Sequence, residues 1–200
     1  MELFKIEFCK GKEGCPRGVG DTKNMYNIIN NTFKETGFSK KRQIHLGKKP
    51  NFHHIFKVGI AGCANCCSQP QIKEFALVAK ALPTINHDLC TLCGLCMNSC
   101  KEKALYLVDR KLVLNKAQCL GCGDCWRVCP EGAIVSGEVN WRLLIGGKLG
   151  RHPQLAKEIK EIKEEEVTKF LRKAIEIIVN FPNPQVRIGQ ILTEGFEVTG

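Results

Sequence analysis

Eight cysteines in the middle of the chain fall into two runs that share one spacing. Residues 90–100 read CTLCGLCMNSC and residues 119–130 read CLGCGDCWRVCP, and both follow C-x2-C-x2-C-x3-C. Three cysteines at two-residue intervals can wrap a loop around three corners of a [4Fe-4S] cubane, while the fourth reaches a second cubane. We therefore expect the two runs to exchange their last ligands. The predicted ligand sets are Cys90, Cys93, Cys96 and Cys129 for one cluster, and Cys119, Cys122, Cys125 and Cys100 for the other.

Residues 85–136, which contain both runs, resemble a two-cluster bacterial ferredoxin. Pro130 follows the second run as it does in that family, whereas Lys101 stands at the matching position of the first run. The alternative is a pair of zinc sites, but zinc ribbons usually supply two C-x2-C pairs from separate hairpins. A ferredoxin-like unit carries electrons and makes no bonds by itself. The function must therefore depend on the residues that flank it.

The flanking residues contain the other five of the 13 cysteines. CKGKEGC at residues 9–15 is a C-x5-C pair, and CANCC at residues 63–67 offers a C-x3-C pair. Each pair lies beside glycines that favour turns, and a helix and a strand are expected between them. The two pairs fit a third [4Fe-4S] cluster held by Cys9, Cys15, Cys63 and Cys67. This assignment leaves Cys66 as the unused thiol and explains the odd number of cysteines.

C-x5-C followed by G-C-x-N-x-C resembles the signature of the sirohaem and [4Fe-4S] domain of sulfite and nitrite reductases. The likeness extends to GIAGCANCCSQPQIKEF at residues 59–75 and to GGKLGRHPQLA at residues 146–156. A ferredoxin insertion after the second cysteine pair is typical of the dissimilatory and anaerobic branch of this family. One departure is Ala64, which stands where proline is usual.

The resemblance implies a path for electrons. In the family the residue at the position of Cys67 also bonds the iron of sirohaem, so Cys67 would join the third cluster to the haem. Electrons would pass from the ferredoxin clusters to the third cluster and through Cys67 to sirohaem, where sulfite or nitrite is reduced. The predicted catalytic residues are Cys67 and Arg151. The predicted cofactor-binding residues are Cys67, Asn65, Arg17, Arg151 and His152.

A different class of function stays open. Catalytic chains of the family carry a substantial N-terminal half before C-x5-C, whereas Cys9 lies near the start of this sequence. Part of a sirohaem pocket would then have to come from a partner subunit or a second copy. The alternative is a non-catalytic three-cluster electron-transfer protein, or a subunit lacking sirohaem.

The composition of the chain indicates which cellular compartment and which kinds of partner to expect. No signal peptide and no apolar stretch long enough to cross a membrane is apparent, so we expect a cytoplasmic protein without disulfides. The formal net charge is +10, which partly offsets the negative charge of bound clusters. We expect a low-potential electron donor, a small oxyanion substrate if the protein is catalytic, and an oligomer or complex. We expect no nucleic-acid partner, because the densest basic run, residues 40–42, is interpreted as a solvated face.

The pattern of apolar residues predicts an α/β (α+β) fold. Strands are expected at residues 3–8, 54–62, 75–82 and 140–146, and helices at residues 21–36, 157–180 and 186–194. We expect a sulfite reductase-like sheet with covering helices, formed by residues 1–84 and 137–200 together. Residues 85–136 would be a two-cluster ferredoxin-like insertion in that discontinuous domain.

Overall fold

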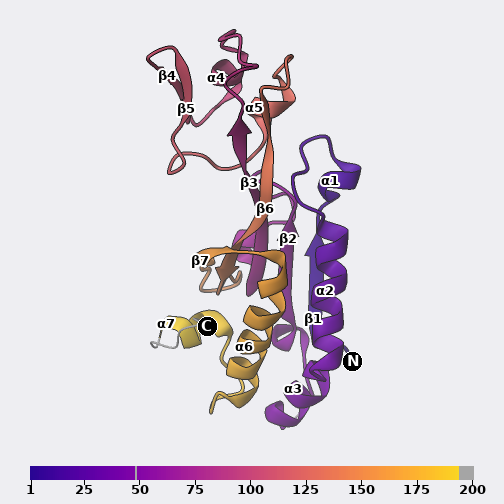
Figure 1. Ribbon diagram of the computed structural model, residues 1–200. Helices are drawn as coiled ribbons and strands as arrows, with labels where there is room; N and C mark the ends of the chain where they lie inside the picture. The colour runs from indigo at the N-terminus through magenta and orange to yellow at the C-terminus, as the bar shows by residue number, and fades with distance from the viewer. Residues whose placement is uncertain (48, 194–200) are drawn as a thin grey trace.

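The computed structural model describes residues 1–47 and 49–193 and is built around a five-stranded sheet (Figure 1). The strand order is β1-β2-β3-β6-β7. Strands β1 (Phe4–Phe8), β2 (Phe56–Ala61) and β3 (Phe75–Ile85) run parallel, whereas β6 (Ile134–Ile145) and β7 (Lys157–Ile162) continue the sheet in antiparallel pairs. The prediction of a mixed α/β fold with helices covering a sheet is therefore confirmed.

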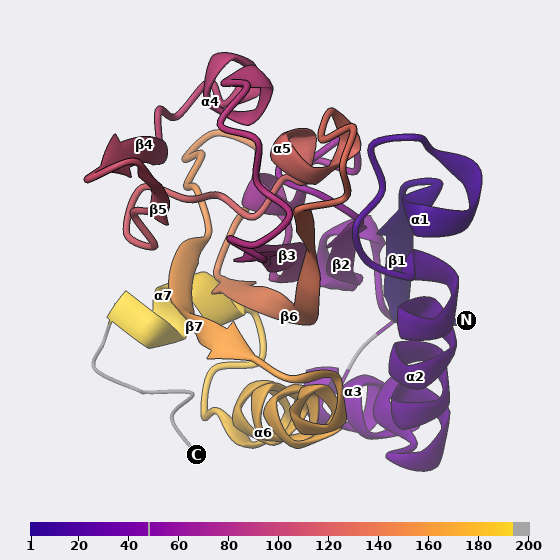
Figure 2. The same cartoon turned by 45° about the horizontal axis from the view of Figure 1, so that its top comes forward.

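Helices α2 (Thr22–Glu35), α3 (Phe38–Leu46) and α6 (Val167–Asn180) lie together on one side of the sheet (Figure 2). Helix α2 begins where expected, because the Asp21 carboxylate accepts hydrogen bonds from the amides of Lys23 and Asn24 at 3.0 and 2.9 Å. The apolar core between the helices and the sheet is almost completely shielded from solvent, and the side chains of Phe33, Trp141 and Phe170 are at most 2% exposed. This packing holds β1 and β2 in place, and the flanking cysteine pairs Cys9/Cys15 and Cys63/Cys67 follow the ends of these two strands.

The segment between β3 and β6 forms a separate small unit at one end of the sheet (Figure 1). It contains α4 (Leu95–Ser99), the hairpin β4 (Leu105–Val108) and β5 (Lys111–Leu114), and α5 (Asp124–Arg127). Its own apolar cluster includes cysteines of both runs, among them Cys96 and Cys125, which pack beside Leu105, Leu112 and Ile134. Strands β3 and β6 pair as far as Ile85 and Ile134, so both strands extend further toward this unit than the sequence pattern predicted.

One predicted helix is partly wrong. Residues 157–162 form strand β7, a 3₁₀ turn follows at Glu164–Glu166, and α6 begins only at Val167. Ile162 pairs with Trp141 of β6 and is 1% exposed, so burial against the sheet outweighs the helical preference of the lysines and glutamates around it. The short C-terminal helix α7 spans Ile188–Thr193, and the rest of the predicted segment 186–194 that follows it lies outside the described residues.

The interpretation of residues 40–42 as a solvated basic face is also wrong for Arg42. These residues lie in α3, for which the sequence predicted no helix. Arg42 is 3% exposed, and its Nη1 donates a hydrogen bond to the carbonyl of Ile178 at 3.1 Å. Its charge therefore stabilises the last turn of α6.

Three further short elements lie in the segments around β1 and β2. Helix α1 (Gly11–Gly14) lies inside the C-x5-C segment, and 3₁₀ turns span Phe52–His54 and Pro70–Ile72. The structure includes no helix among its described residues that is long and apolar enough to cross a membrane.

Candidate iron–sulfur sites

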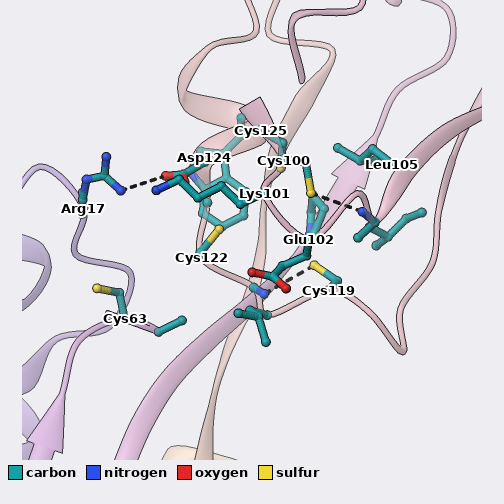
Figure 3. Close-up of a pocket in the computed structure, with 18 of the residues that line it drawn as sticks. Arg17, Cys63, Cys100, Lys101, Glu102, Leu105, Cys119, Cys122, Asp124 and Cys125 are labelled. Carbon is teal, nitrogen blue, oxygen red and sulfur yellow. Dashed lines mark hydrogen bonds and ion pairs between the residues drawn. The ribbon is translucent and has the colours of Figure 1, made fainter. Parts of the chain in front are cut away.

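The first three cysteines of the second run and the last cysteine of the first run face one cavity, which we call the inner site (Figure 3). Its cysteines are Cys100, Cys119, Cys122 and Cys125. Burial raises the pKa of the Cys119 thiol, and nearby Cys122 and Cys100 raise it further. Burial also raises the pKa of Cys125 to about 12. Metal coordination deprotonates a thiol outright, so this crowded group of thiols suits a bound metal cluster better than free thiols.

The loop of the inner site rests against strand β3. The Ala81 amide donates to the Gly121 carbonyl at 3.3 Å, and a Cβ added to Gly121 would lie 2.7 Å from the Ala81 nitrogen. Gly121 also has φ of +63°, a conformation that favours glycine. The loop can therefore approach the sheet only because this residue has no side chain.

The other four cysteines of the insertion face a second cavity, the outer site. They are Cys90, Cys93, Cys96 and Cys129. Burial raises the pKa of the Cys96 thiol, and Cys90 and Cys93 raise it further. Cys100 thus lines a cavity with three cysteines of the second run, and Cys129 lines the other with three cysteines of the first. The exchange of cluster ligands itself stays a prediction.

The two flanking cysteine pairs, Cys9 with Cys15 and Cys63 with Cys67, meet at the ends of β1 and β2. These strands are parallel neighbours, so Cys9 and Cys63 follow them at the same edge of the sheet. The Gly62 amide donates to Cys9 Sγ at 3.1 Å. Burial raises the pKa of the Cys63 thiol, and Cys9, Cys15 and Cys67 raise it further because all three lie near it. We call this group of four thiols the third site.

The adjacent cysteines Cys66 and Cys67 are directed differently. Asn65 Nδ2 donates to Cys67 Sγ at 3.2 Å, and Cys67 is exposed at the surface. Cys66 has φ of +54° and packs against a small apolar cluster on the sheet that includes Val78 and Leu144. Burial raises the pKa of Cys66. The left-handed backbone at Cys66 thus separates the spare thiol from its neighbour.

The inner site and the third site share one cavity wall. Cys63, Ala64 and Asn65 line the same cavity as the inner-site cysteines, and Figure 3 shows Cys63 across this space from Cys122. Trp126 lines the cavity too and packs against the apolar clusters of both the insertion and the main domain. The arrangement keeps the two cysteine groups next to each other, and Trp126 supplies aromatic surface beside them.

Three charged residues connect the two sites. Arg17, a predicted cofactor ligand, lies 3.8 Å from Asp124 across the gap, and Arg127 lies 3.6 Å from the same carboxylate. Figure 3 shows Arg17 directed at Asp124. Sequence analysis missed Asp124 and Arg127, because nothing in the cysteine spacing distinguishes them from other charged residues between ligands.

The two remaining predicted site residues lie apart from these contacts. Arg151 and His152 are exposed, and within the described part of the chain neither side chain forms a hydrogen bond or an ion pair. The segment that carries them nevertheless adjoins the exit of the Cys67 loop. The amides of Gly147 and Ala156 donate to the carbonyls of Lys73 and Gln71 at 2.9 and 2.7 Å.

A [4Fe-4S] cubane bonds four thiolates to four different irons, so groups of cysteines suit such a cluster. Cys100, Cys119, Cys122 and Cys125 line one cavity, and Cys90, Cys93, Cys96 and Cys129 line another. Cys9, Cys15 and Cys67 lie near Cys63. Within residues 1–47 and 49–193, no group of three or more histidine, cysteine, aspartate or glutamate side chains is placed to hold a single metal ion.

The family described as "Nitrite and sulphite reductase 4Fe-4S domain" matches residues 2–194. The chain belongs to this family, as the cysteine motifs predicted, and this membership defines an iron–sulfur protein with a redox role.

Among curated relatives, a coenzyme F420-dependent sulfite reductase of Methanocaldococcus jannaschii is 29% identical over 84% of this chain and 25% of its own length. The β subunit of a dissimilatory-type sulfite reductase of Nitratidesulfovibrio vulgaris is 26% identical over 50% of this chain and 30% of its own. This chain therefore spans less than a third of either relative.

Solved structures show the same fold. The structure of dissimilatory sulfite reductase I has a TM-score of 0.66 at 16% identity, covering 95% of this chain and 49% of that one. The NirA protein of Mycobacterium tuberculosis has a TM-score of 0.54 at 12% identity, covering 96% of this chain and 25% of that one. These likenesses confirm the sheet with covering helices that the sequence predicted.

Proposed function

We propose that the protein is a three-cluster electron relay that forms the [4Fe-4S] part of an anaerobic sulfite or nitrite reductase. The observation that carries this proposal is the grouping of eight cysteines around two cavities, with Cys9, Cys15 and Cys67 near Cys63 beside the inner one. In this proposal residues 85–136 act as a ferredoxin-like insertion in a main domain of residues 1–84 and 137–200. Bound clusters would supply one-electron transfer at low potential.

The outer and inner sites would carry out successive steps of electron transfer in such a relay. The outer site lies at the end of the insertion, so it suits the entry of electrons from a low-potential donor protein. The inner site adjoins Cys63 of the third site, so it suits the step toward the main domain. Trp126 and the apolar walls exclude water from that gap and lower the local dielectric.

The third site is the proposed connection to sirohaem. Cys67 is the only thiol of this group that is exposed, so among the described residues it is the ligand that a second iron centre could reach. Its hydrogen bond from Asn65 would orient the sulfur and moderate its charge. Arg17, Arg151 and His152 are the proposed cationic groups for the carboxylates of that cofactor or for a sulfite or nitrite anion.

A relay without sirohaem is the second candidate function. Cys67 is open to solvent, and Arg151 and His152 contact no group of the three sites in the described residues. A catalytic form would therefore need further protein surface around Cys67, supplied by a complex or by a second copy. Several relatives of this chain carry names of oxidoreductase subunits, which supports a role in a complex.

An absorption spectrum of anaerobically purified protein separates the two candidates. Reductive catalysis predicts the bands of an isobacteriochlorin, together with a shift of those bands when sulfite is added. The pure relay predicts about 12 irons and no macrocycle bands, at four irons for each cubane. A spectrum without iron–sulfur absorption, from protein that was never exposed to air, would contradict both.

A further inference from the structure

Arg127 ends helix α5 and lies between two cysteines that belong to different sites, Cys125 and Cys129. Its guanidinium is a forked donor that reaches from the insertion to the main domain. Nη1 donates to the Cys122 carbonyl at 2.8 Å, and Nη2 donates to the Gly18 carbonyl at 3.3 Å. The fork therefore joins the loop of the inner site directly to the main domain.

The Gly18 carbonyl that accepts the second hydrogen bond lies beside the third site. The amide of Gly18 donates to the carbonyl of Cys15 at 2.9 Å, so Gly18 belongs to the turn that follows a cysteine of that site. One planar side chain thus connects a cysteine of the inner site with the turn of a cysteine of the third site. Arginine suits this task because its donors have a fixed planar geometry that lysine lacks.

The guanidinium is held on its other sides as well. The Asp124 carboxylate lies 3.6 Å from Arg127 Nη1, and the centre of the guanidinium lies 5.6 Å from the Trp126 ring centre. A Cβ on Gly123 would lie 2.7 Å from Arg127 Nη1, so the absence of a side chain at Gly123 leaves room for the fork. The position of Arg127 is thereby fixed by contacts with Cys122, Asp124, Trp126 and Gly18.

We propose that Arg127 is a positioning residue that sets the separation and the relative potentials of the inner and third clusters. The inference rests on the proposed function, because it needs both clusters to be bound. Each bound cluster with its thiolates carries negative charge, so two of them in adjoining sites repel each other. A fixed cation between their loops reduces that repulsion and favours the reduced form of the inner cluster.

The neighbouring charges do not duplicate this role. Arg17 lines the same cavity and approaches Asp124, but its side chain is 60% exposed and it donates to no carbonyl of either loop in the described residues. Lys101 and Glu102 also line the cavity and have opposite charges. Arg127 is therefore the cation that combines charge with direct hydrogen bonds to both sides.

The test compares Arg127→Gln and Arg127→Lys with a matched control, Arg110→Gln. Arg110 is in the same insertion, at the turn between β4 and β5, away from the gap. Electron paramagnetic resonance of the reduced holoprotein measures magnetic coupling between the clusters, and potentiometric titration measures the midpoint potential of the inner cluster. Iron is counted in every variant.

Arg127→Gln is expected to weaken the coupling and to lower the reduction constant of the inner cluster by roughly three- to tenfold, which is about 30–60 mV for one electron. Arg127→Lys keeps the charge but loses the fork, so it should weaken the coupling with a smaller change in potential. Arg110→Gln should change neither quantity.

Two results would overturn the inference. One is wild-type coupling and potential in Arg127→Gln at a full iron count, and the other is an equal effect of Arg110→Gln. A wild-type count of about 8 irons would mean that one cluster is absent, at four irons for each. That outcome contradicts the three-cluster relay itself and is thereby distinguishable from a failure that concerns Arg127 alone.

Discussion

Replacing Cys100 and Cys122 together by serine is expected to remove one cluster, whereas replacing Cys96 and Cys100 together removes two. Cys100 and Cys122 line the inner site, and Cys96 lines the outer site. Iron should therefore fall from about 12 per chain to about 8 in the first variant and to about 4 in the second, at four irons per cubane. Iron and acid-labile sulfide analysis of anaerobically purified protein measures the difference.

This pair of variants separates the crossed arrangement from a sequential one. Each variant loses two thiols, so the number of cysteines is matched. If each cysteine run held its own cluster, the Cys100/Cys122 variant would lose two clusters and the Cys96/Cys100 variant only one. That reversed order of iron contents would contradict the predicted exchange of ligands.

Replacing Cys67 by serine is expected to remove the third cluster and any activity that depends on sirohaem, while both clusters of the insertion stay in place. Cys67 is exposed and is not a member of the main apolar core, so the fold should survive the change. A serine oxygen is a harder ligand than a thiolate and binds iron–sulfur clusters poorly. Iron per chain should fall to about 8, at four irons for each remaining cubane.

The adjacent Cys66→Ser variant is the matched control. Its thiol packs against Val78, Leu144 and their neighbours on the sheet and is not one of the four proposed ligands of the third site, although Cys63 and Cys67 lie near it. The control should therefore keep the full iron content. Loss of the third cluster in Cys66→Ser but not in Cys67→Ser, or sulfite or nitrite turnover that survives Cys67→Ser, would show that the wrong cysteine was assigned.

The grouping of cysteines around the two cavities of residues 85–136 was predictable because cysteine spacing carries strong geometric information. C-x2-C-x2-C-x3-C fixes which thiols share a loop, and the two flanking pairs follow neighbouring parallel strands. The strands and α2 were predictable for similar local reasons, such as alternating apolar residues before Cys9 and the Asp21 cap.

Contacts that depend on tertiary packing were not visible in the sequence. The charged segment 157–162 has a helical composition, yet Ile162 is buried in the sheet beside Trp141. The Arg127 fork joins residues 109 positions apart, and no local pattern indicates that Gly18 would accept its hydrogen bond. Arg42 was interpreted as solvated because its partner at Ile178 is also remote in sequence.

The third cluster is the part of the account on which the connection to sulfite and nitrite reductases depends most. An anomalous difference map, measured at the iron absorption edge on crystals grown without oxygen, locates every cluster directly. We expect three separate iron peaks, one of them enclosed by Cys9, Cys15, Cys63 and Cys67. Two peaks confined to the insertion, with those four thiols free of iron, would contradict the account.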